Sequence, residues 1–270
     1  MKLFGAKSGV KFVLTVLICV GSAVMLHGDT MVATFDPAKT QAPNTTTLCG
    51  SDPVCWIGEQ TFPTASVPAA GNFPTLVSKG AAGAQIAGTY SGGITISNTY
   101  EWGGAGGAGY YPTVSNSSYT LTLTTSGGLP GVNYFGMWLS ALDSANELQF
   151  YEGSVLLYTF TPTMFVSLVG PCPNASNAFC GNPNNQEDAN EQFAFLNFYD
   201  ETGYFNKIVF SESDSSGLES DNQTVGYMNP VVPTGTPIAA TPEPASFVLL
   251  LIGVLALLGV MRRPTAISLR

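Results

Sequence analysis

Short stretches of alternating apolar and polar residues, separated by turn-forming residues, recur along the middle of this chain. In the clearest of them, Tyr119, Leu121 and Leu123 alternate with threonines at every second position. A period of two places the apolar side chains on one face of an extended strand, which is typical of a strand with one buried face. Further segments share this β-branched and aromatic character: 93–96, 134–142, 147–152, 155–161, 193–199 and 204–211.

These segments predict an all-β fold, an antiparallel β-sandwich or jelly-roll-like domain over residues 81–232. Seven or more strands at spacings of about 8–12 residues favour two packed sheets. A stretch of about 150 residues is long enough to bury one substantial core. Tight connections are predicted at 143–146 and 152–154, and a short helix at 162–169 between a threonine N-cap and a terminal glycine.

The composition changes on either side of this domain. Residues 29–80 contain six prolines and weak periodicity, which indicates a loop-rich arm. Residues 233–241 cannot build a core and are predicted to be a linker that holds the domain off a membrane. At the N-terminus, three lysines precede an apolar run and then small residues, the order of a secretory signal peptide, placed here at residues 1–28. An uncleaved N-terminal anchor is the alternative.

The tail, residues 242–270, combines three features in a fixed order. It begins with a rigid extended motif, Pro242, Glu243 and Pro244. An apolar run over 245–261 follows, which is long enough for a short transmembrane helix at ~1.5 Å per residue. The basic segment 262–270 then opens with Arg262 and Arg263. Arginines beside a membrane span stay in the cytoplasm, so the chain before Pro242 is expected on the far side.

This order of motif, apolar segment and basic stop resembles the PEP-CTERM sorting signal of exopolysaccharide-producing Gram-negative bacteria. The resemblance implies processing by an exosortase-type enzyme, a transient anchor in the inner membrane, and delivery to the cell surface or extracellular matrix. A plain C-terminal anchor with a chance Pro-Glu-Pro motif is the alternative.

A second resemblance covers roughly residues 90–230 and is to the β-sandwich region of exosortase-dependent surface proteins. It implies a fold and a location, and no catalytic residue set. The segments that carry it are 133–143, 147–153, 205–210 and 219–222.

The charge of the exported region excludes several classes of function. Between Asp29 and Thr241 there are three basic residues against seventeen acidic ones, a formal charge of −14, with neither arginine nor histidine. A nucleic-acid partner is excluded because no basic patch can neutralise a phosphate backbone. A catalytic arrangement that depends on histidine is excluded as well, so we do not expect an enzyme. Carboxylate chemistry and cation binding by oxygen ligands remain.

Four cysteines of the exported region fall into two close pairs. In an oxidising compartment disulfides are expected, and local pairing is the simplest of the three connectivities. The pairs are Cys49 with Cys55 and Cys172 with Cys180. Redox-active or metal-binding thiols are the alternative.

Candidate ligand residues are few. Clustered oxygen ligands could hold calcium, the one cofactor left open. The candidates are Glu187 and Asp188 in an acidic loop, and Asp221 and Asn222 ahead of the last expected strand. A solvated charged loop and an ordinary turn are the alternatives. Trp138 is expected in the core, whereas Trp56 and Trp102 are better placed to meet a ligand. The glycine-rich segment 103–109 is interpreted as a hairpin connection, because no helix or lysine follows it.

Together these features predict an exported cell-surface or matrix protein with a structural or adhesive role in association with exopolysaccharide. The alternative is a calcium- or carboxylate-dependent carbohydrate-binding module or glycoside-acting enzyme. Hydrolysis of a glycoside would need two carboxylates facing each other across a cleft, and the sequence assigns no such pair.

Overall fold

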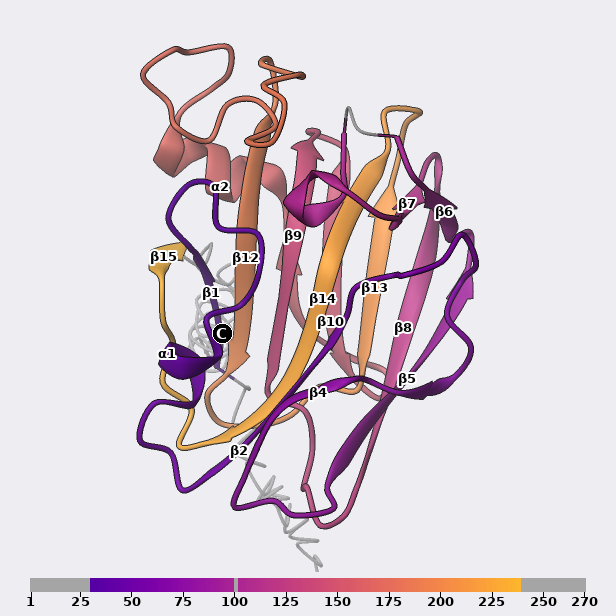
Figure 1. Ribbon diagram of the computed structural model, residues 1–270, viewed down its shortest axis with the longest axis vertical. Helices are drawn as coiled ribbons and strands as arrows, with labels where there is room; N and C mark the ends of the chain where they lie inside the picture. The colour runs from indigo at the N-terminus through magenta and orange to yellow at the C-terminus, as the bar shows by residue number, and fades with distance from the viewer. Residues whose placement is uncertain (1–29, 100–101, 239–270) are drawn as a thin grey trace, which may run out of the picture.

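The computed structural model describes residues 30–99 and 102–238, and it shows two antiparallel sheets packed face to face (Figure 1). Sheet A lies in front in that view and sheet B behind it. The order across sheet A is β15 (Thr236–Ile238), β1 (Met31–Phe35), β12 (Gln192–Asp200), β9 (Tyr134–Leu142), β14 (Leu218–Asn229), β2 (Val54–Gln60) and β4 (Thr75–Lys79). The predicted all-β class is confirmed.

Two further strands extend sheet A, and six strands form sheet B. In sheet A, β7 (Tyr111–Val114) pairs with β14 and with β6 (Thr95–Ser97). The order across sheet B is β11 (Val155–Phe160), β10 (Asn146–Glu152), β13 (Lys207–Glu212), β8 (Ser117–Ser126), β5 (Gln85–Gly92) and β3 (Gly71–Asn72).

The main hydrophobic core fills the space between the two sheets. On β8, Tyr119, Leu121 and Leu123 are buried while Thr122 and Thr124 are exposed, so the predicted alternation is confirmed. Aromatic rings from both sheets meet in this core. The Phe150 ring of sheet B lies 4.7 Å from the Phe198 ring of sheet A, centroid to centroid.

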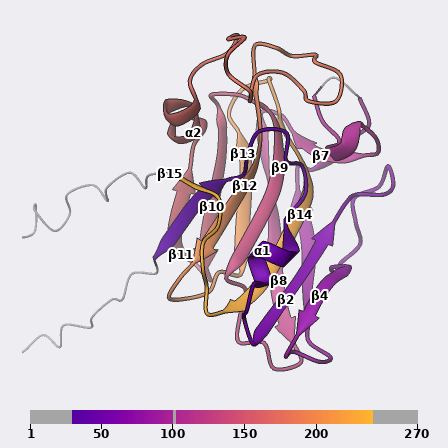
Figure 2. The ribbon, with the colours of Figure 1, turned by 60° about the vertical axis from the view of Figure 1, so that its left-hand side comes forward.

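Sheet A is buried on its outer face as well. Every residue of β9 and every residue of β12 is buried. The covering comes from the segment after β1, which includes the short helix α1 (Thr45–Cys49), and from the segment between β6 and β7. Figure 2 shows α1 lying against this face. Helix α2 (Pro162–Val169) packs against the core between the two sheets.

The predicted connections form as expected from their local chemistry. Residues 143–146 make a tight turn, with the Asn146 amide 3.2 Å from the Asp143 carbonyl, and the turn carries the chain from β9 of sheet A to β10 of sheet B. Gly153 has a φ of +59°, which suits the tight turn of the β10–β11 hairpin. Helix α2 starts after Thr161 and ends at Gly170, which has a φ of +91°.

The expectation of a loop-rich arm over residues 29–80 is wrong for much of its length. β1, β2 and β4 of this region are strands of sheet A. Their partners are distant in the sequence: β1 pairs with β12 and β2 pairs with β14. Strands that depend on distant partners leave a weak local pattern, which explains the error. Residues 36–53 keep the name "arm" below, because they cross the outer face of sheet A between β1 and β2.

The prediction that residues 233–241 form a linker is wrong for part of this range. Residues 236–238 form β15, which pairs with β1 at the edge of sheet A. Pro237 within it is tolerated because an edge strand has one unpaired side. Within the described ranges, no helix is long and apolar enough to cross a membrane. The predicted signal peptide, the motif at 242–244, the apolar run at 245–261 and the basic pair all lie outside these ranges.

Candidate functional site

The first disulfide fastens the arm to sheet A. Cys49 at the end of α1 and Cys55 in β2 are joined, with their Cα atoms 5.6 Å apart, as predicted. Asn44 caps α1, because its Oδ1 accepts a hydrogen bond of 3.1 Å from the Thr47 amide. Both sulfur atoms are buried in a small hydrophobic cluster with Tyr134 of β9. The bridge therefore holds the arm against the outer face of the sheet.

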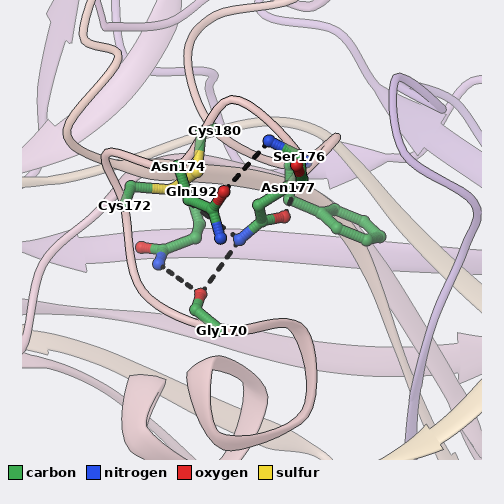
Figure 3. Close-up of a disulfide and its surroundings, with 8 residues drawn as sticks. Gly170, Cys172, Asn174, Ser176, Asn177, Cys180 and Gln192 are labelled. Carbon is green, nitrogen blue, oxygen red and sulfur yellow. Dashed lines mark hydrogen bonds between the residues drawn. A yellow bond between two sulfur atoms is a disulfide. The ribbon is translucent and has the colours of Figure 1, made fainter.

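The second predicted disulfide, Cys172–Cys180, fastens the loop that follows α2 (Figure 3). The Gly170 carbonyl accepts hydrogen bonds of 3.0 Å from Asn177 Nδ2 and from Gln192 Nε2. These bonds tie the end of α2, the disulfide loop and the first residue of β12 together. The first disulfide thus stabilises a segment that covers sheet A, whereas the second stabilises a loop whose Phe179 packs against the core between the sheets.

Asp221 and Asn222 were expected in a turn ahead of a strand, but they lie within β14 itself, at an irregularity in its pairing with β9. Asp221 Oδ2 accepts a hydrogen bond of 2.8 Å from the Ala105 amide in the glycine-rich segment 103–109. Asn222 has a φ of +48°, and its Nδ2 donates to the Gln41 carbonyl at 2.7 Å. The pair anchors the arm and the glycine-rich connection of the β6–β7 hairpin to sheet A.

Glu219, two residues earlier on β14, shares the outer face of the sheet with Asp221. Burial raises the pKa of Glu219 to about 8, and the pKa of Asp221 to about 7. Hydrogen bonds offset the shift only in part: Thr113 Oγ1 donates to Glu219 at 3.1 Å, and two backbone amides donate to Asp221. Glu219 therefore holds a proton at neutral pH. Both carboxyls lie on one strand, and not on opposite walls of a cleft as glycoside hydrolysis requires.

Glu187 and Asp188 are in the loop after the second disulfide. Asn185 Nδ2 donates a hydrogen bond of 2.7 Å to Glu187, and the Glu187 carbonyl accepts from the Asn182 amide. Asp188 has a φ of +50°. Among the described residues, no group of three or more His, Cys, Asp or Glu side chains is arranged to hold a metal ion. Calcium binding stays a prediction.

The three tryptophans differ in their surroundings. Trp138 is buried, as expected, but on the outer face of sheet A beside Phe193. Trp56 is fully buried in the core between the sheets, so the expectation that it meets a ligand is wrong, because its position on β2 points inward. Trp102 is 39 % exposed.

An open cavity of about 380 Å³ lies between the arm, β12 and the segment before β15. We call it the arm cavity. It is lined by Asp36, Thr40, Thr47, Leu48, Asn197 and Thr234, among others. Asn197 of β12 is 1 % exposed, and its Oδ1 accepts a hydrogen bond of 2.8 Å from Tyr134 Oη.

Sequence reasoning missed the arm cavity. One signal for Asn197 was present in the sequence. It is the only strongly polar residue in the apolar run 193–199, and a period of two puts it on the same face as Phe195 and Tyr199. A buried polar side chain among aromatic residues needs hydrogen-bond partners, so Asn197 is a candidate site residue.

Comparison of the chain with protein-family models, with curated proteins and with solved structures gives no match in any of the three. Functional inference therefore rests on the sequence and on the sites described above.

Proposed function

We propose that this protein is exported, anchored in the inner membrane by its tail, and then delivered by an exosortase-type enzyme to the cell surface or matrix, where it has a structural or adhesive role. The observation that carries the proposal is the pairing of β1 with β15, in which Ala33 lies opposite Ile238. The chain enters and leaves the sandwich at the same edge. A membrane anchor attached after Ile238 would hold the sandwich by this edge. The rest of the sandwich would then be accessible to partners at the cell surface.

The two disulfides support export, because such bonds persist in oxidising compartments. The spacing of the tail also supports the proposal. Three residues separate Ile238 from Pro242, so an enzyme that reads the motif would act close to the folded sandwich.

A substitution in the motif tests the sorting step. In cells that carry out this sorting, Glu243→Ala should leave full-length, unprocessed protein in the inner membrane, and fractionation with immunoblotting would show the change in mass and compartment. Glu201→Ala is the matched control, because Glu201 is an exposed acidic residue next to the edge where the chain enters. Normal maturation of the Glu243 variant would contradict the sorting step.

A second candidate function is carbohydrate binding, with calcium or a carboxylate as the recognition element. The observation that favours it is the arm cavity, which opens to solvent and contains a carboxylate and an amide. Calcium is tested by melting the protein with and without the ion. A ligand that binds only the folded state adds about 2.7 kcal/mol of stability at a hundredfold excess over Kd, which shifts Tm by several degrees.

A further inference from the structure

The arm cavity has a buried floor and an exposed rim. Leu48 and Asn197 on the floor are buried, whereas Asn44, Thr47 and Gly235 on the rim are exposed. A molecule from solvent can therefore reach the floor. The volume, about 380 Å³, falls in the range of roughly 300–1,000 Å³ that is usual for small-molecule sites.

The floor contains a buried hydrogen-bond donor that is poorly satisfied. Tyr134 Oη donates to Asn197 Oδ1, which fixes the orientation of the side-chain amide. Asn197 Nδ2 is buried and makes no hydrogen bond of normal length among the described residues; its weaker interaction is with the Asp36 carboxyl. A poorly satisfied buried amide donor is costly, so a group that accepts its hydrogen bond is favoured at this position.

An acceptor faces this donor. The carboxyl group of Asp36 lines the same cavity, and burial raises its pKa while the nearby Asn197 amide lowers it in part. The two groups thus face each other without a hydrogen bond of normal length between them. A ligand atom that both donates and accepts could bridge them, as a hydroxyl group does.

The rest of the lining narrows the class of ligand. The lining has neither lysine nor arginine, so it offers nothing to neutralise an anion. Three threonines add hydroxyl groups and methyl groups, and Leu48 adds an apolar surface. Hydroxyls beside apolar C–H surface are the features of a neutral sugar.

We propose that the arm cavity binds a neutral saccharide, one hydroxyl of which donates to Asp36 and accepts from Asn197. This inference names the ligand class for the adhesive role and so rests on the proposed function. Sorting through the tail is separate, because it depends on Glu243.

The test measures binding of methyl glycosides of glucose, galactose and mannose to the purified full-length protein, by saturation-transfer NMR and by titration calorimetry. Asp36→Asn keeps the size of the side chain and removes its charge, and should weaken binding about tenfold or more, because hydrogen bonds to a charged group are the stronger kind. Thr47→Trp should block the cavity and abolish binding. Thr46→Trp is the matched control, since Thr46 is an equally exposed neighbour on α1 that does not line the cavity.

Binding that is lost in the Thr47 variant and kept in the Thr46 variant would support the proposal. Three outcomes would overturn it: no binding of any of the three glycosides at millimolar concentration, binding that Thr47→Trp leaves unchanged, or binding only of glucuronate, an ammonium compound or calcium. Circular dichroism of each variant separates loss of binding from loss of fold. Normal processing together with absent sugar binding would overturn this inference alone.

Discussion

The two sheets of the sandwich differ in the exposure of their outer faces to solvent. On β8 of sheet B the pattern is simple, because apolar residues face the core and polar residues face solvent. Sheet A is covered on both faces at its centre, so β9 and β12 are buried along their whole length. The covering elements are the arm and the glycine-rich segment 103–109, which are held by the first disulfide and by side-chain hydrogen bonds.

This difference determines where polar chemistry can occur. On the outer face of sheet B, Thr122 and Thr124 are in contact with solvent. On the outer face of sheet A, Asn197, Glu219 and Asp221 are withdrawn from water, and the pKa values of the two carboxyls rise. A sheet with a covered outer face can therefore build a site in its middle, whereas a solvated sheet face offers only a flat surface.

Equivalent truncations on the two outer faces test the comparison most strongly. Phe195→Ala, beneath the covering segments, should destabilise the fold by about 3–5 kcal/mol, because it leaves a cavity in a packed cluster. Thr122→Ala on sheet B should change the free energy of unfolding by less than about 0.5 kcal/mol. Urea denaturation measures both. Similar costs at the two positions would contradict the difference between the faces.

Removing the disulfide that holds the arm should have the next largest effect. The double variant Cys49→Ala/Cys55→Ala should lose about 2–3 kcal/mol, the value expected for a short closed loop. Hydrogen exchange should rise in α1 and β2, while β8 and β13 of sheet B stay protected until global unfolding. Equal loss of protection in both sheets would show that the covering and the sandwich unfold as one unit.

The buried carboxyls of sheet A predict a pH dependence. Glu219 titrates at about 8 in the folded protein, against an ordinary value of 4.5, so unfolding in this window releases its proton. Its contribution to stability is complete below the ordinary value and is lost as the pH rises through about 8. We expect the free energy of unfolding to fall between pH 5 and pH 8, by up to ~1.4 kcal/mol for each pH unit, measured by urea denaturation. Glu219→Gln should flatten the slope, and an unchanged slope would contradict the assignment.

The smallest effect is expected on the open face of sheet B. Lys207 Nζ lies 3.9 Å from the centroid of the Tyr151 ring. An exposed cation–π contact contributes roughly 0.5–1 kcal/mol, so Lys207→Met should cost no more than that. A loss above about 2 kcal/mol would show that this face is more important to stability than its exposure indicates.

The parts of the fold that depend on local patterns could be predicted from the sequence. Helix α2 was predicted with its bounds, because Thr161, Pro162 and Gly170 carry strong terminal signals. β8 was predicted from its alternation, and the two disulfides from the spacing of the cysteines. In these cases a few neighbouring residues contain all the information.

The parts that depend on distant partners could not be predicted. β1 becomes a strand because β12 and β15 flank it, and the arm cavity forms because Asp36 and Asn197 arrive from different elements. Asp221 and Asn222 were predicted as possible cation ligands, and the fold brings them into contact with the arm and the glycine-rich segment. Residues with unusual chemistry can be found in a sequence, whereas the partners that decide their role come from the fold.

The pairing of β15 with β1 also limits when the sandwich can be completed. The last described strand, β15, pairs with the first strand, β1, at the edge of sheet A. This edge is therefore incomplete until residue 238 is in place. If the protein is exported as proposed, nearly all of the domain would have to cross the membrane before this edge could be completed. Under the same proposal, completion of the sandwich and anchoring by the tail would be consecutive steps of export.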